Sequence, residues 1–148
     1  MPKLLAIDPG GTTGIAHIEF NSLKPPVLTK VEQVEGGLQG FLRWYQGRQG
    51  SWDRIVCEDF VLRTNVKFPD LSPTYIIGAL EQGEHFNPIK PVYQSPSLKP
   101  MCSDAVLKRI GFYTKAMPHA NDATRHGIIY LRNIKNMPTL EMVWPRED

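Results

Sequence analysis

The chain has 148 residues, of which 41% are hydrophobic and 22% charged, and a formal net charge of +2 at pH 7. This is the composition of an ordinary globular protein, and the length predicts a single domain over 1–148. No apolar run approaches the ~20 residues that span a bilayer and the N-terminus lacks a secretory signal, so we expect a cytoplasmic protein without membrane contact. Cys57 and Cys102 lie far apart with no ligand-like spacing, which favours reduced thiols over a disulfide or zinc site.

Positive charge is concentrated in one part of the chain. Residues 86–135 carry eight Lys and Arg against two Asp, a net charge of +6, while the remainder sums to −4. A basic segment of this kind suits a polyanion such as nucleic acid, because phosphate contacts supply much of non-specific binding. The alternative is a solvated basic face with no partner.

The first half of the chain predicts three neighbouring strands, a helix and a fourth strand. KLLAID (3–8) is a short apolar strand that ends in an acid, and the PGGTTG turn leads to alternating strands at 15–20 and 27–34. The short connections between these strands favour an antiparallel meander. Apolar residues at helical spacing predict a helix at 36–49, and the apolar run at 54–60 predicts the fourth strand.

The second half alternates helices with one strand. Ser-Pro marks the start of a helix at 73–86, and the prolines of 88–94 place a fifth strand at a sheet edge. A capped helix follows at 103–110 and a closing helix at 119–131, with 136–148 expected to be a loosely packed tail. This order describes an α/β protein with a mixed five-stranded sheet flanked by helices, the ribonuclease-H-like arrangement.

Acidic residues stand at the ends of two apolar strands and at the start of the closing helix. Asp8 ends the first strand and Glu58 stands near the end of the fourth, where a carboxylate is costly to bury unless it is paired or binds a metal. His119 and Asp122 are three apart on one helix face, and His126 lies one turn deeper. Three carboxylates and one imidazole suit Mg²⁺ or Mn²⁺, and two such ions can hydrolyse a phosphodiester. The alternatives are a surface carboxylate for Glu58, a helix cap for His119 and, favoured for His126, a hydrogen-bonded structural role.

Three stretches together resemble the motifs of RuvC-like Holliday-junction resolvases, especially the bacteriophage branch: IDPGGTTGIA, VCEDF and HANDATRHG. The resemblance covers 3–131 and implies a ribonuclease-H-like fold, a homodimer, and cleavage of Holliday junctions and related branched DNA with two Mg²⁺ or Mn²⁺ ions. It places the catalytic and metal-binding roles on Asp8, Glu58 and Asp122. His119 stands where many members have a further aspartate, so it is expected to favour Mn²⁺ as a ligand or to act as a general base.

Candidate DNA contacts lie near these motifs. Thr12 and Thr13 follow the glycine-rich turn and have hydroxyls that could bind phosphate. Arg63, Lys67 and Phe68 lie in the loop after the fourth strand, where the aromatic ring could stack on a base or wedge a junction open. The simpler alternatives are a hairpin turn for the threonines and loop packing for Phe68.

Further contacts are expected around the closing helix. The resemblance implies that Lys99, Lys108 and Lys115 contact the DNA backbone, and Arg125 could line the outer face of the closing helix. The helix at 73–86 has more apolar surface than one narrow stripe, so it is the candidate dimer surface, unless it packs wholly on its own sheet.

Three other functions stay open. IDPGGTTGIA also resembles the phosphate-binding hairpin of the actin, chaperone ATPase and sugar kinase superfamily, but those proteins close two such domains around a nucleotide, and we expect no nucleotide cofactor here. A nuclease of the same chemistry could cut flaps and forks broadly. A non-catalytic binding module would leave the acids without a role.

Overall fold

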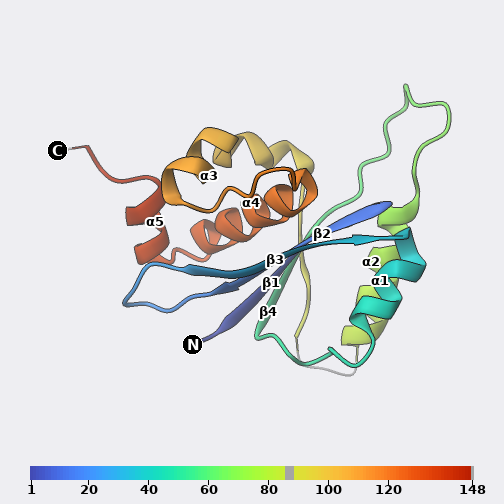
Figure 1. Cartoon of the computed structure of the whole chain (residues 1–148), viewed down its shortest axis with the longest axis horizontal. Helices are drawn as coiled ribbons and strands as arrows, with labels where there is room; N and C mark the ends of the chain where they lie inside the picture. Colours follow the sequence, from blue (N-terminus) through green and yellow to red (C-terminus); the bar gives the residue numbers. More distant parts are fainter. Residues whose placement is uncertain (86–88, 148) are drawn as a thin grey trace.

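The structure is a computed structural model that describes residues 1–85 and 89–147. Five strands form one mixed sheet in the order β3-β2-β1-β4-β5 (Figure 1). Their bounds are β1 (Lys3–Asp8), β2 (Thr12–Glu19), β3 (Val27–Glu35), β4 (Arg54–Glu58) and β5 (Val92–Gln94). The first three strands pair antiparallel, whereas β4 pairs parallel with both β1 and β5. The predicted ribonuclease-H-like sheet, with β5 at its edge, is confirmed.

Helices cover both faces of the sheet. Their bounds are α1 (Gly37–Tyr45), α2 (Ser72–Glu84), the 3-10 helix η1 (Pro96–Cys102), α3 (Asp104–Ile110), α4 (Pro118–Asn133) and α5 (Met137–Val143). Figure 1 shows α1 and α2 on one side of the sheet and α3, α4 and α5 on the other. The parts of the expected elements 73–86 and 88–94 that fall on 86–88 lie outside the described residues. Among the described helices, none combines the length and apolar character that a membrane crossing requires.

Strand β1 lies in the middle of the molecule because both of its faces are apolar. Leu5 and Ile7 point to the core beneath α1 and α2, while Leu4 and Ala6 point to the core beneath α4. All four are fully buried. A strand covered on both faces reads as a continuous apolar run, and this is why KLLAID lacks alternation.

Helix α4 lies unusually close to the sheet. A Cβ atom at Gly127 would come within 2.5 Å of Ile18 Cδ1 and 3.3 Å of Ala6 Cβ. The absence of a side chain at this position therefore lets the apolar half of α4 rest directly on β1 and β2. The polar first turn of α4 then extends to the carboxyl end of β1.

The end of the chain is better packed than expected. Within the segment 136–148, predicted to be a loose tail, Thr139 and Val143 of α5 are fully buried. Arg109 of α3 donates a hydrogen bond to the Val143 carbonyl, and the Asn136 side chain accepts from Thr139 N at 3.1 Å as the helix cap. The prediction of loose packing was wrong for 137–143, because tertiary contacts stabilise a helix too short to be evident from its sequence.

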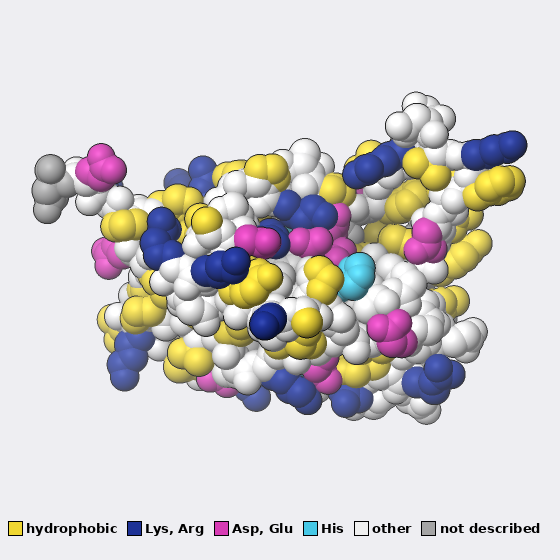
Figure 2. Space-filling view, turned by 45° about the horizontal axis from the view of Figure 1, so that its top comes forward, with side chains coloured by type: hydrophobic (Ala, Val, Ile, Leu, Met, Phe, Trp, Pro, Cys, Tyr) yellow, Lys and Arg dark blue, Asp and Glu magenta, His cyan; other side chains and the backbone are white. Residues whose placement is uncertain are grey.

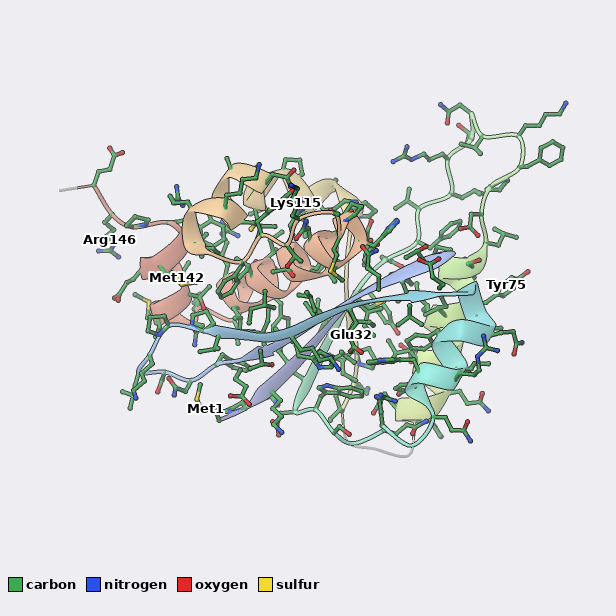
Figure 3. The ribbon with its side chains drawn as sticks, viewed as in Figure 1. Met1, Glu32, Tyr75, Lys115, Met142 and Arg146 are labelled. Carbon is green, nitrogen blue, oxygen red and sulfur yellow. The ribbon has the colours of Figure 1, made fainter. Side chains whose placement is uncertain are left out.

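Helix α2 packs mainly on its own sheet. Ile76 and Leu80 are fully buried in the core with α1 and β1. Tyr75 is 55% exposed, and Figure 3 shows it directed away from the body of the protein. Most of the apolar surface that suggested a dimer contact is therefore used within the chain, and the homodimer stays a prediction.

Candidate active site

Two carboxylates meet at the carboxyl ends of β1 and β4. The parallel register pairs Ile7 with Cys57, so Asp8 and Glu58, the next residues, end the two strands side by side. Their side chains are only 13% and 11% exposed. Asp122, in the second turn of α4, faces the same place and is 28% exposed. The three acids that the sequence singled out thus lie together, and Figure 2 shows acidic side chains gathered on this face of the molecule with basic ones beside them.

Burial and neighbouring groups shift the pKa values of Asp8 and Glu58 in opposite directions. Burial, followed by the hydrogen bond and negative charge of Glu58, raises the pKa of Asp8 well above its usual range. The pKa of Glu58 moves in the opposite direction: burial opposes ionisation, but contacts from His126 and Asp8 and the charge of Lys99 outweigh it. The two shifts favour a protonated Asp8 beside an ionised Glu58, and a cation bound to both carboxyls would displace that proton.

Lys99 of η1 lies inside the acid cluster. Its Nζ is 3.3 Å from Glu58 Oε1 and 3.4 Å from Asp122 Oδ2. The sequence marked Lys99 only as a DNA-backbone contact. The structure adds a second role, because the ammonium group neutralises part of the charge of two carboxylates that approach from different elements.

Arg125 is also held by internal partners. Its Nε lies 3.0 Å from Asp122 Oδ1, its Nη1 donates to the Cys102 carbonyl at 3.0 Å, and Nη2 pairs with Asp104. The side chain is 11% exposed. The expected exposed position on the outer face of the closing helix is therefore wrong, since the guanidinium instead fixes Asp122 and joins α4 to the start of α3.

His119 stands at the rim of the cluster. Its imidazole is 47% exposed, and Nδ1 is 3.6 Å from Asp8 Oδ2. The start of α4 is fixed from the sheet, since Gln33 Oε1 accepts hydrogen bonds from His119 N at 3.0 Å and Ala120 N at 3.3 Å. A Cβ atom at Gly14 would lie 1.9 Å from the His119 carbonyl oxygen, so only glycine permits this approach. Sequence reasoning missed Gln33, whose partners lie 86 and 87 residues away.

His126 is fully buried behind Glu58. Its Nε2 lies 3.2 Å from Glu58 Oε2, without the alignment of a good hydrogen bond. With the Gln94 amide oriented to suit its neighbours, that amide donates to His126 Nδ1 at 2.9 Å and accepts from Tyr130 N at 3.2 Å. This leaves the imidazole proton on Nε2, facing Glu58. The geometry agrees with the structural, hydrogen-bonded role that was favoured for His126.

The donor set suits a hard divalent cation. Asp8, Glu58 and Asp122 supply oxygen ligands and His119 supplies one imidazole. Glu58 Oε2 is buried against His126 Nε2 at 3.2 Å, while Oε1 lies 3.3 Å from Lys99 Nζ. Across residues 1–85 and 89–147, however, no three His, Cys, Asp or Glu side chains are already drawn close enough to hold a metal ion. The residues therefore fit a metal in their chemistry, while their present spacing is set by the contacts with Lys99 and His126.

The two threonines of the glycine-rich turn serve the fold. Thr13 is fully buried, and its hydroxyl donates to the Gly10 carbonyl at 3.3 Å. Thr12 donates to Glu35 Oε2 on β3 at 2.8 Å. Thr13 is thus not exposed to bind phosphate, which favours the simpler hairpin-turn explanation for this position.

The remaining DNA-binding candidates are exposed on either side of the acid cluster. Arg63, Lys67 and Phe68 lie on the segment 59–71, which extends away from the sheet between β4 and α2 (Figure 1). Phe68 is 85% exposed, with Lys67 Nζ 5.8 Å from its ring centre. On the other side, Lys108 Nζ lies 4.7 Å from the Tyr113 ring.

Lys115 completes the second group. It is exposed in the loop before α4, and Figure 3 shows it on the side of α3 and α4. Exposed cations therefore lie both on the segment 59–71 and on α3 and the loop after it, with the acids between these two groups.

Known proteins resemble this chain in structure. No protein-family model matches the chain, and no curated protein sequence matches it. RuvC of Thermus thermophilus with a Holliday junction substrate is similar with a TM-score of 0.64 and 13% identity, over 90% of this chain and 97% of that one. A structure of Thermus thermophilus RuvC gives a TM-score of 0.56 and 12% identity, over 90% of this chain and 97% of that one. The Fowlpox virus resolvase with Holliday junction DNA gives a TM-score of 0.65 and 14% identity, over 89% of this chain and 98% of that one.

The chain has the ribonuclease-H-like fold of RuvC. The resemblance that the three sequence motifs carry is thus confirmed at the level of the fold, over about nine-tenths of the chain. At 12–14% identity the fold is what these structures have in common with this chain.

Proposed function

We propose that this chain is a metal-dependent endonuclease that cleaves Holliday junctions and related branched DNA. The observation that carries the proposal is the meeting of Asp8, Glu58 and Asp122 from β1, β4 and α4, in a fold shared with two resolvases that were solved with junction DNA. Three carboxylates brought together at one edge of a sheet are costly to bury, and a bound metal would offset that cost.

In this proposal, Asp8, Glu58, Asp122 and His119 hold Mg²⁺ or Mn²⁺, with two ions expected. When bound, the metal supplies an activated water and stabilises the charge on the leaving oxygen of the phosphodiester. Glu58 is oriented by His126 and Lys99, and Asp122 by Arg125. The ammonium group of Lys99 adds positive charge where the scissile phosphate would lie.

DNA binding is assigned to the exposed cations on both sides of the acids. Lys108 and Lys115 would contact the backbone from one side, and Arg63 and Lys67 from the other. Phe68, which is 85% exposed and lies beside Lys67, would stack on an unpaired base near the branch point. A junction presents two equivalent strands, so a homodimer would place one site at each.

The test is cleavage of labelled DNA of several shapes. A four-way junction, a flap, a fork and a linear duplex are incubated with Mg²⁺ or Mn²⁺ and either wild type or Asp122→Asn. We expect paired nicks on the junction that require metal and disappear in the variant. Asp53→Asn is the matched control, because Asp53 lies at the opposite end of β4 and an amide oxygen can still accept from Lys3 N.

Three outcomes would change the proposal. Equal cutting of all branched forms would keep the chemistry and remove the preference for junctions. Junction binding without cutting in either metal would indicate a binding module. Equal activity of wild type and Asp122→Asn would remove Asp122 from the site.

A further inference from the structure

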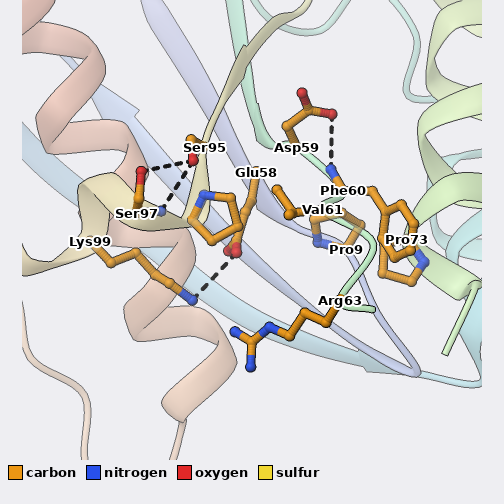
Figure 4. Close-up of a pocket in the computed structure, with 11 residues that line it drawn as sticks. Pro9, Glu58, Asp59, Phe60, Val61, Arg63, Pro73, Ser95, Ser97 and Lys99 are labelled. Carbon is orange, nitrogen blue, oxygen red and sulfur yellow. Dashed lines mark hydrogen bonds and ion pairs between the residues drawn. The ribbon is translucent and has the colours of Figure 1, made fainter. Parts of the chain in front are cut away.

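A pocket adjoins the acid cluster and extends beyond it. It is a cavity of about 460 Å³ between the end of β4, the start of α2 and the start of η1 (Figure 4). Glu58 and Lys99 form the wall that it shares with the acid cluster. Whatever occupies the pocket therefore lies next to a phosphate bound at the acids.

The walls of the pocket are flat and largely apolar. Phe60 and Val61 line one side, and the rings of Pro9, Pro73 and Pro96 line others. Flat apolar surfaces of this kind suit a planar ring system, because stacking and dispersion contacts are made over its whole face.

The polar groups of the pocket are of both kinds: the cations Arg63 and Lys99 donate, the carboxylates Glu58 and Asp59 accept, and two hydroxyls can do either. Arg63 lines it, and the part of the chain that the structure describes offers its guanidinium no ion pair or hydrogen bond. Figure 4 shows this guanidinium turned toward the side of Lys99. Ser95 and Ser97 supply hydroxyls 2.8 Å apart, of which Ser95 caps η1 through Ser97 N at 3.2 Å. A planar ligand with acceptors along one edge and N–H donors along another fits this set.

We propose that the pocket receives one unstacked nucleobase of the cleaved strand, next to the scissile phosphate, and favours guanine. This deepens the proposed nuclease function and rests on it. Arg63 and Lys99 offer donors only, and guanine presents two adjacent acceptors, O6 and N7, where adenine presents an acceptor beside a donor. Extruded bases are held in this way, by stacking together with hydrogen bonds to their edges.

The first measurement is binding. A junction with the fluorescent guanine analogue 6-methylisoxanthopterin at successive positions around the branch point is mixed with Asp122→Asn, so that nothing is cut. We expect fluorescence to rise at one position, where the base leaves its stack, and to rise less with Asp122→Asn/Phe60→Ala. Uniform fluorescence at every position would overturn the pocket assignment.

The second measurement is cleavage of junctions that carry each of the four bases at that position. We expect wild type to favour guanine by about 10-fold, the scale of one bidentate base contact. Arg63→Met should lose this preference and Ser97→Ala should weaken it. Lys67→Met is the matched control, an equal loss of charge on the same segment but outside the pocket, and it should keep the preference.

The outcomes separate this inference from the function on which it rests. Cleavage at equal rates for all four bases, or a preference that survives in Arg63→Met, would overturn the pocket and leave the nuclease standing. No cleavage of any branched DNA would overturn both. Arg63 and Ser97 are exposed, so both variants are expected to fold, and thermal unfolding checks this.

Discussion

Gln33 shows how one side chain positions a site that it does not enter. It belongs to β3, two strands away from Asp8, yet its amide oxygen holds the first backbone N–H groups of α4. These groups lack a partner within the helix, and Met117 at the cap position offers no side-chain hydrogen bond. The orientation of His119 and Asp122 therefore depends on a residue of another element.

We expect Gln33→Leu to lower the free energy of unfolding by about 1–2 kcal/mol, because it leaves two helix N–H groups without their acceptor. Junction cleavage should fall more than stability alone explains, since the start of α4 carries two proposed ligands. Urea unfolding and single-turnover cleavage measure the two effects. Gln39→Leu, on the exposed face of α1, is the control, and equal behaviour of the two variants would contradict the role of Gln33.

His119 gives a prediction about metal preference. An imidazole is softer than a carboxylate and adds no negative charge, so His119→Asp should raise the ratio of Mg²⁺-supported to Mn²⁺-supported cleavage severalfold. His119→Ala should lower cleavage in both metals and should also lose the Mn²⁺ preference that the imidazole confers. If His119→Asp shows the wild-type ratio and rate, His119 is neither ligand nor base.

Helices and strands whose own sequence has a clear hydrophobic pattern were predictable. Elements that depend on tertiary contacts with distant residues were not. The strand-end acids followed from apolar runs that stop at Asp8 and Glu58, and α4 followed from its apolar second half. The proline-containing η1 was not predicted, because proline usually ends a helix and only a 3-10 segment tolerates it here. Lys99 therefore entered as a distant DNA contact, although η1 carries it into the acid cluster.

The packing of helix α5 can be tested by substituting one buried and one exposed residue. Val143→Ala should destabilise the protein by about 1–3 kcal/mol, since it removes buried methyl groups between α3 and α4. Met137→Ala changes a residue of the same helix that is 50% exposed and should cost less than about 0.5 kcal/mol. Thermal unfolding compares the two, and equal midpoints would restore the expectation of a loosely packed tail.

Over the whole molecule, the excess of positive charge on 86–135 divides into two parts. Lys99 and Arg125 are used within the protein, against Glu58 and the aspartates of α3 and α4. Lys108 and Lys115 stay exposed. Net charge along the sequence could indicate a polyanion partner, but it could not separate these parts, because Glu58 reaches Lys99 and Asp104 reaches Arg125 from other elements.

We expect Lys108→Gln/Lys115→Gln to weaken junction binding regardless of sequence and to reduce the slope of log affinity against log salt by about 2. Lys24→Gln/Arg146→Gln removes the same charge from exposed positions away from the acids and should leave the slope near its wild-type value. Binding titrations across a range of salt concentrations measure this. An unchanged slope in the first variant would remove both lysines from the interface.

The ammonium group held between Glu58 and Asp122 has a consequence for how the protein matures. Three carboxylates brought together repel one another, and a chain without a countercharge of its own would depend on metal to reach its final shape. Here the countercharge is part of the polypeptide. Folding and metal loading can then be separate events, so that the chain can fold before it binds either of the ligands proposed for it, metal or DNA.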